Sequence, residues 1–190
     1  MIPIRVAVAT ALVPLALTAC GGGGHKTTAG SAPTSAAAGS TSASSALPTT
    51  ATPSGSTTPV SVPVSHPAAH LVAVRVARQA GSDRVVFEFR DRTPGYRVEY
   101  ATGPVMNTEG REVAVAGPAK LVIHMEQATG ADSYTGPARL GAQGTTQVQE
   151  VARVEDFEAV LRWVVGVRSQ APFRVTTLTA PPRLVIDVIG

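Results

Sequence analysis

The chain has 190 residues and a formal net charge of +3, and its length is that of one ordinary domain. Residues 71–190 carry 14 basic and 13 acidic side chains and no basic run, so we predict no nucleic-acid interface. The one cysteine excludes an intramolecular disulfide framework and a paired-cysteine metal or redox site. No apolar run reaches the roughly 18 residues that a membrane-spanning helix needs.

The N-terminal segment, residues 1–19, has the pattern of an export signal. Arg5 precedes about a dozen apolar or small residues, which is the length of a signal-peptide core. The sequence LTAC at residues 17–20 resembles the lipobox of bacterial lipoproteins. That resemblance implies cleavage before Cys20 and attachment of acyl chains such as palmitate, and two or three such chains anchor a protein stably. The alternatives are a plain secretory signal with a chance cysteine, or a short buried helix.

Residues 20–69 are predicted to form a tether. Of the 49 residues from 21 to 69, 42 are Ala, Ser, Thr, Gly or Pro, and only Lys26 is charged. Such a segment cannot bury enough apolar surface to offset the entropy of ordering it, so we predict a disordered linker. As a coil its ends lie roughly 40 Å apart, which suits a domain held away from a membrane surface.

The remaining segment, residues 70–190, alternates between apolar and polar residues with the period of a β-strand. Turn-forming residues separate the alternating runs, as expected for short antiparallel strands. The runs are centred on residues 71–77, 85–90, 96–100, 113–115, 121–126, 148–154, 161–168, 173–177 and 184–188. The Gly-rich stretch from 128 to 145 is predicted to be a loop.

This pattern predicts an all-β fold: a single antiparallel β-sandwich or open barrel of eight to nine short strands. The valines at 148, 151 and 154 are three residues apart, which a β-bulge between Gln149 and Val151 would reconcile with a strand. A helical turn is an alternative at the start of 156–165, but the β-branched residues from 160 to 167 favour a strand. Charged residues between apolar ones are predicted to point into solvent and to pair across strands: Glu88, Glu99, Arg174 and Asp187.

No catalytic motif is present in the sequence. His124 alternates with Ile123, which predicts a surface position on the face opposite Ile123. A nucleophile needs a positioned base, and no other histidine lies inside the strand region. The carboxylates at 155, 156 and 158 have the spacing of a solvated turn. We therefore predict no enzyme, no catalytic residue, no metal site and no cofactor.

Several motifs in the strand region together resemble the AMIN-like domains of actinobacterial lipoproteins. They are GSDRVVFEF at 81–89, PGYRVEY at 94–100, WVVGV at 163–167 and PRLVIDV at 182–188. The resemblance covers residues 71–190. It implies a small β-sandwich with a targeting or binding role in the cell envelope, and for AMIN domains proper the implied ligand is peptidoglycan.

Four arginines are the candidate ligand-binding residues: Arg97, Arg162, Arg168 and Arg174. Arginine presents a planar fork to carboxylates, and peptidoglycan offers both sugars and carboxylates. The arginines alternate with Tyr96, Trp163 and Phe173, so if the arginines face outward the aromatic residues belong to the core. Two functions remain open: binding of peptidoglycan or another wall polymer through an arginine-bearing sheet face, and docking of an envelope protein. Both place the chain on the extracytoplasmic face of the cell membrane, lipid-anchored through Cys20.

Overall fold

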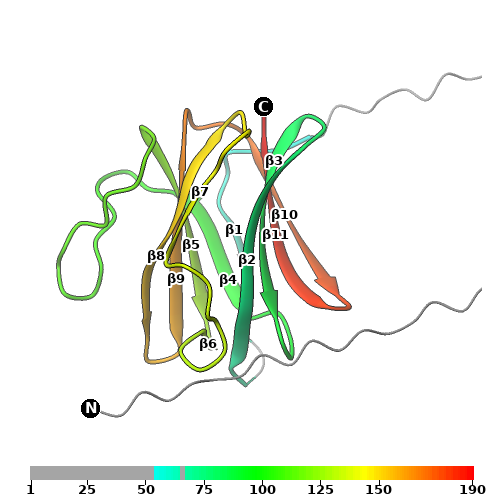
Figure 1. Ribbon diagram of the computed structural model, residues 1–190, viewed down its shortest axis with the longest axis vertical. Helices are drawn as coiled ribbons and strands as arrows, with labels where there is room; N and C mark the ends of the chain where they lie inside the picture. Colours follow the sequence, from blue (N-terminus) through cyan, green and yellow to red (C-terminus); the bar gives the residue numbers. More distant parts are fainter. Residues whose placement is uncertain (1–53, 65–66) are drawn as a thin grey trace, which may run out of the picture. The chain divides into compact units, whose positions relative to one another are not determined.

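The computed structural model describes residues 54–64 and 67–190. Within these residues the chain is all-β and forms two sheets that pack face to face (Figure 1). The predicted all-β fold and sandwich architecture are confirmed. None of the described residues forms a helix long and apolar enough to cross a bilayer. The predicted signal segment, Cys20 and most of the predicted tether lie outside the described residues.

The first sheet has six strands, all paired antiparallel. Across the sheet they are β1 (Val60–Val62), β4 (Gly95–Tyr100), β5 (Ala119–Glu126), β9 (Val160–Val167), β8 (Val148–Phe157) and β7 (Arg139–Gly141). β8 and β9 form a hairpin whose two turn residues, Glu158 and Ala159, both have positive φ, as a twisted two-residue turn requires. Residues 156–165, for which a helical turn was the alternative, therefore form the end of β8, a turn and the start of β9.

The second sheet has five strands. In order they are β10 (Phe173–Thr179), β11 (Pro182–Ile189), β3 (Ser82–Phe89), β2 (Ala69–Gln79) and β6 (Ala128–Thr129). β2 and β3 form a hairpin, with Gly81 in the turn at φ 75°. β6 pairs parallel with β2, so the domain is not wholly antiparallel as predicted.

The core lies between the two sheets and contains the inward half of each alternating strand. Trp163 is fully buried at its centre and meets Phe87 and Tyr134 edge to face, at ring separations of 5.8 and 5.7 Å. Tyr96 and Phe173 are also buried, which confirms that the aromatic residues of the arginine-bearing strands face the core. Recognition by stacking on these aromatic rings is therefore not available to a ligand.

One buried carboxylate, Asp83, fastens a loop to the end of the sandwich. Its side chain is fully buried, and one oxygen accepts backbone N–H bonds from Thr146, Gln147 and Val148. A carboxylate that accepts several backbone N–H groups stabilises a tight loop, because it bonds groups that have no partner strand. Asp83 thus orders the end of the Gly-rich stretch just before β8.

The structure corrects three sequence-based expectations about elements. Val113 and Val115 belong to no strand, because they lie in a loop that packs on the outside of the six-stranded sheet. The Gly-rich stretch contains two short strands, β6 and β7. β1 pairs with β4, so an ordered strand lies inside the segment assigned by composition to the tether. The described part contains eleven strands, which is roughly consistent with the predicted eight or nine because three of the eleven have only two or three residues. The bulge near Gln149 is confirmed by the register shift between Val148 and Glu150.

Candidate functional site

The outer face of the six-stranded sheet is partly covered by the segment that joins β4 to β5. This segment, residues 101–118, is called the β4–β5 loop; it extends beyond the sheet and is drawn in green in Figure 1. Its two arms pair where the Val113 N–H donates to the Val105 carbonyl at 2.8 Å. At its tip, the Asn107 carboxamide oxygen accepts the N–H groups of Glu109 and Arg111 at 3.1 and 2.8 Å. The β4–β5 loop therefore has an ordered, hairpin-like conformation.

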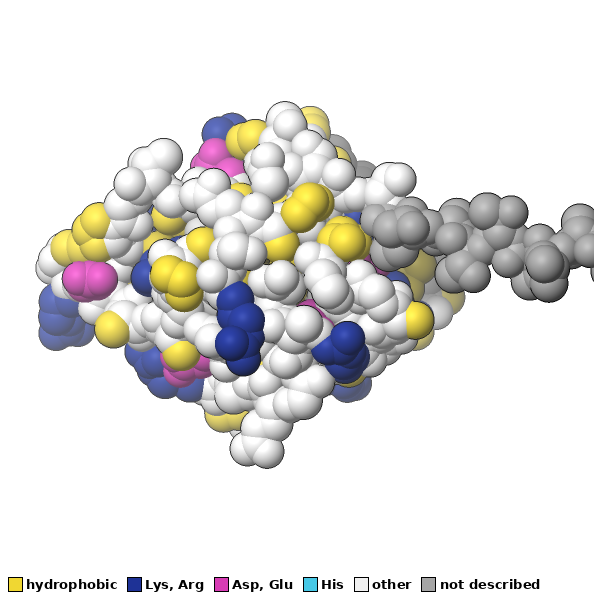
Figure 2. Space-filling model, turned by 90° about the horizontal axis from the view of Figure 1, so that it is seen from above, with side chains coloured by type: hydrophobic (Ala, Val, Ile, Leu, Met, Phe, Trp, Pro, Cys, Tyr) yellow, Lys and Arg dark blue, Asp and Glu magenta, His cyan; other side chains and the backbone are white. Residues whose placement is uncertain are grey.

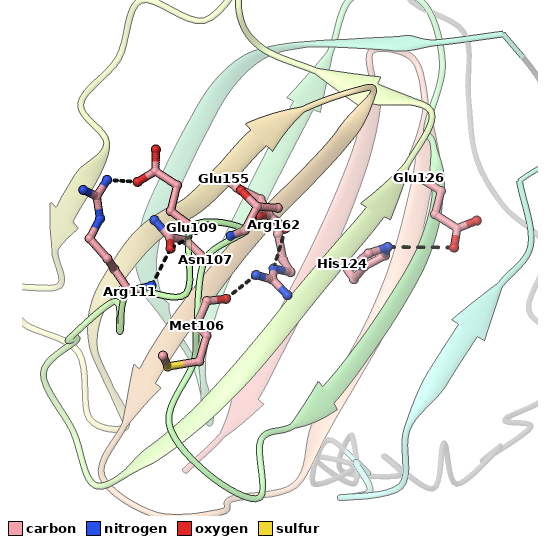
Figure 3. Close-up of polar contacts among 9 residues, drawn as sticks. Met106, Asn107, Glu109, Arg111, His124, Glu126, Glu155 and Arg162 are labelled. Atoms are coloured by element: carbon pink, nitrogen blue, oxygen red, sulfur yellow. Dashed lines mark hydrogen bonds and ion pairs between the residues drawn. The ribbon is translucent and has the colours of Figure 1, made fainter.

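An ion pair on the sheet holds the first arm of this loop (Figure 3). Arg162 on β9 and Glu155 on β8 contact each other at 3.0 Å between Nε and Oε1. Glu155 also accepts the Thr108 N–H at 3.0 Å, and Arg162 donates to the Met106 carbonyl. The pair thus satisfies loop backbone groups that no strand would bond.

A second pair holds the returning arm. Glu150 accepts the Ala116 N–H at 2.8 Å and contacts Arg139 at 2.7 Å, and Arg139 donates to the Ala114 carbonyl at 2.6 Å. Burial raises the pKa of the Glu150 carboxyl, but the Ala116 N–H and Arg139 outweigh it, so its pKa lies below the ordinary value. The carboxylate therefore stays ionised where it meets the loop.

Beneath the loop lies a small apolar cluster that is separate from the main core. Its buried members are Val105 of the loop and, from the sheet, Ala152, Val154 and Val164. Gly166 lets the returning arm approach closely, because a Cβ there would lie 1.8 Å from the Ala116 carbonyl oxygen. The loop is thus packed against β8 and β9, while the outer faces of β4 and β5 remain open.

The open part of this face contains two adjoining hollows of about 470 and 480 Å³, which we call the outer hollow. They share Glu99, Val122 and Arg162. β1 borders one side through residues 61–63, and the β4–β5 loop borders the other through residues 101–106. The outer hollow therefore has an apolar floor at Val122 and a charged rim, and it opens to solvent between two chain segments.

The charged groups of the outer hollow come from adjacent strands. Arg97 donates to Glu99 through both Nε and Nη2, at 2.6 and 2.7 Å, and both side chains are exposed. The hydrogen bonds from Arg97 hold the pKa of Glu99 below its ordinary value. His124 lies 3.8 Å from Glu126 on β5 (Figure 3). Donors and acceptors thus alternate along the rim, as a neutral polyhydroxyl or zwitterionic ligand requires.

The structure brings together two of the four candidate arginines. Arg97 and Arg162 both line the outer hollow, and in the register of the sheet each is paired with His124 between them. Arg168 follows the end of β9, away from the hollow. Arg174 is on β10 of the other sheet. The four arginines therefore do not share one face.

Arg174 belongs to a charged cluster on the outer face of the five-stranded sheet. Asp187 on β11 accepts a two-pronged contact from Arg84 on β3, at 2.7 and 3.0 Å, and a bond from Arg174 at 2.9 Å. Asp187 is 1% exposed, which corrects the expectation that it is solvated; its predicted cross-strand pairing is confirmed. Burial raises the pKa of its carboxyl, but the two arginines outweigh it, so the pKa lies below the ordinary value.

Comparison with known families gives one result, and a search of curated proteins finds no match. The model of the AMIN-like domain matches residues 69–190, which is well over half of the chain. The chain belongs to the AMIN-like domain family. AMIN-like domains are binding modules of the cell envelope rather than catalytic domains, and the predicted resemblance to this family is confirmed.

Three residues of this AMIN-like domain line the outer hollow but were not among the binding candidates from the sequence: Glu99, His124 and Glu126. Alternation along β4 places Glu99 on the same face as Arg97, but only the antiparallel register of β4 and β5 brings His124 and Glu126 to that place. His124 lies opposite the fully buried Ile123, as predicted. Pairing between strands cannot be read from alternation alone, so the outer hollow had no signal in the sequence.

The described residues of the AMIN-like domain hold no group of three or more His, Cys, Asp or Glu side chains that fits a metal ion. Figure 2 shows one end of the domain, where basic and acidic side chains are scattered among hydrophobic ones. The charged and polar side chains of the outer hollow support non-covalent binding through hydrogen bonds and charge pairs.

Proposed function

We propose that the chain is a non-enzymatic lipoprotein that binds peptidoglycan or another wall polymer in the outer hollow. Membership of the AMIN-like family supports a binding role in the envelope. The observation that carries the proposal is the open rim of Arg97, Glu99, His124 and Glu126 over the apolar Val122. Sugar rings offer hydroxyls and an apolar face, and peptide stems offer carboxylates and amides, so both kinds of group find partners there.

The location of the chain is part of this proposal. Cys20, at the end of the export-signal pattern, is the acylated residue, and residues 21–53 connect it to the domain. A tether of this composition lets the domain reach polymer strands that lie at a distance from the bilayer. The lipid bilayer and the wall polymer are the two partners.

The test is co-sedimentation with purified, insoluble cell wall. The full chain carrying Cys20→Ser is mixed with wall material, and the bound fraction is compared with that of an unrelated β-sandwich of similar charge. The proposal expects retention that the double variant Arg97→Gln/His124→Ala reduces at least about tenfold, because it removes two of the rim's polar partners. Retention equal to that of the unrelated sandwich would exclude wall binding.

One observation favours a second candidate function, docking of an envelope protein at the edge of β10. Phe173 exchanges both backbone hydrogen bonds with Ser56, at 3.0 and 2.8 Å, so its backbone groups face away from β11. Because backbone direction alternates along a strand, the backbone N–H and C=O groups of Val175, Thr177 and Thr179 also face away from β11. No described strand pairs with them. An extended segment can pair with such an edge.

Site-specific crosslinking in cells distinguishes the two candidates. A photoreactive residue at Thr177 captures a protein if the edge is a docking site. A photoreactive residue at His124 captures wall material if the outer hollow is the binding site. Capture of a protein at Thr177 without wall capture at His124 would favour the second candidate.

A further inference from the structure

The outer face of the five-stranded sheet has a different charge pattern from the outer hollow. In the outer hollow, Arg97 and Arg162 each contact their own glutamate. On the five-stranded sheet, a single carboxylate, that of Asp187, is shared by two arginines. The three residues occupy one row across β3, β11 and β10, because Asp187 is in register with both Arg84 and Arg174. This cluster therefore carries one positive charge that its own carboxylate does not balance.

The nearest carboxylate on the same face does not neutralise this charge. Glu88 is the next acidic residue along the outer side of β3, four residues from Arg84, which is about 13 Å along a strand. It is itself occupied by Arg75, at 2.7 Å. The positive charge of the cluster is thus local to the Arg84 and Arg174 side chains.

Both guanidinium groups keep donors that bind no protein atom in the described part of the chain. Arg84 donates to Asp187 through Nε and Nη2, so its Nη1 has no partner there. Arg174 donates to Asp187 through Nη2 alone, so its Nε and Nη1 have none. The side chains of Arg84 and Arg174 are 39% and 44% exposed, whereas that of Asp187 is 2% exposed. The carboxylate thus lies beneath the two guanidinium groups and fixes them, while their free donors are accessible to solvent.

This geometry favours phosphate over carboxylate as the ligand group. The two guanidinium groups come from strands on opposite sides of β11, so they approach an anion from two directions. A planar carboxylate offers its two oxygens in one plane, and Asp187 already contacts both guanidinium groups in this way. The two non-bridging oxygens of a phosphodiester diverge from a tetrahedral phosphorus, so one can accept from each arginine at once.

We propose that Arg84 and Arg174, held side by side by Asp187, form a binding site for the phosphodiester groups of a soluble or wall-bound anionic polymer. The site lies on the opposite sheet from the outer hollow and takes a different chemical group. It therefore goes beyond the proposed function, and either site can be present without the other. Because the two guanidinium groups come from β3 and β10 of the five-stranded sheet, binding there leaves the outer hollow free.

The test is a titration followed by amide chemical shifts of the isotopically labelled full chain carrying Cys20→Ser. Inorganic phosphate is the first probe, poly(glycerol phosphate) the second, and acetate at equal ionic strength the control anion. The proposal expects saturable shifts in β3, β10 and β11 with both phosphate probes, tighter binding of the polymer, and no saturable shift with acetate.

The variant Arg174→Gln gives the sharpest comparison, because it leaves the two-pronged contact of Arg84 with Asp187 intact and the fold in place. We expect it to weaken binding of the polymer about tenfold, the effect of losing one charge-assisted contact. The matched control Arg111→Gln removes one exposed, paired arginine at the tip of the β4–β5 loop, outside both proposed sites, and leaves binding unchanged. Equal weakening by both variants would show a general charge effect and overturn the site.

Two further outcomes decide the source of the phosphate. Saturable binding of vesicles that contain anionic phospholipid, without binding of poly(glycerol phosphate), would assign the site to a membrane surface and overturn the polymer proposal. Absence of saturable shifts with either phosphate probe, in spectra that show a folded domain, would overturn the site altogether. Loss of wall co-sedimentation in the Arg97→Gln/His124→Ala variant has no bearing on these results, so the two proposals fail independently.

Discussion

Asp187 shows what a single residue in an alternating strand can and cannot reveal. Its place between Ile186 and Val188 predicted an outward side chain and a cross-strand partner, and both predictions are confirmed. Its burial could not be predicted, because it depends on two arginines from strands that are 103 and 13 residues away in the sequence. Only the order of strands in the sheet brings these partners together.

Replacement of this carboxylate tests its contribution to stability. Asp187→Asn leaves two arginines without a counter-charge, and we expect a loss of about 3 kcal/mol in the free energy of unfolding at pH 7, because breaking a buried pair is costly. Chemical denaturation measures it, with Glu126→Gln as an exposed control that changes stability by less than about 0.5 kcal/mol.

The pH dependence of that variant follows from the lowered pKa of Asp187. Its ordinary value is 3.8 and the folded value is lower, so the carboxylate stabilises the fold fully above about pH 4 to 5. This contribution is lost as the pH falls through the folded pKa. The difference between the natural chain and Asp187→Asn should therefore be constant near neutral pH and shrink below pH 3.8. A difference that stays the same at pH 3 would contradict this account.

At the scale of elements, the β4–β5 loop is the feature that the sequence represented least well. Val113 and Val115 alternate as a strand does, but the alternation reflects packing on the outside of the sheet rather than pairing within it. Apolar residues at two-residue spacing cannot distinguish these cases in so short a run. The regular strands, which are longer and bounded by turns, were predicted close to their observed positions.

Gly166 is the residue on which the position of this loop depends. A methyl group there would meet the Ala116 carbonyl, so we expect Gly166→Ala to displace the loop and to destabilise the domain by about 1–3 kcal/mol. Denaturant unfolding measures the change. Gly141→Ala is the matched control, because a Cβ at this strand position meets no atom within 4 Å. Equal stability of the two variants would show that the loop has another packing.

For the whole molecule, alternation and turn signals were enough to predict two packed layers of strands. They did not predict that β1 extends the six-stranded sheet, because the three residues Val60–Val62 lie in a stretch of low complexity. Nor did they predict the parallel pair of β2 and β6, since a two-residue strand has no periodic signal. Short edge strands are defined by their partners rather than by their own sequence.

The proposed location of the molecule is tested by Cys20→Ser. An acylated chain is expected in the membrane fraction, and the serine variant, which has no sulfur for the thioether, is expected in the soluble extracytoplasmic fraction. Cell fractionation with immunodetection measures the distribution. If the serine variant remained in the membrane fraction after signal processing, the anchor would have to be a different feature.

The central claim is that the outer hollow binds a wall polymer. The most direct measurement is an amide chemical-shift map of the labelled chain titrated with soluble peptidoglycan fragments. The account predicts saturable shifts confined to β4, β5, residues 61–63, residues 101–106 and Arg162, with Arg97, Glu99 and His124 among the most affected. Saturable shifts that lie elsewhere on the domain, or none at fragment concentrations that saturate a known wall-binding domain, would contradict it.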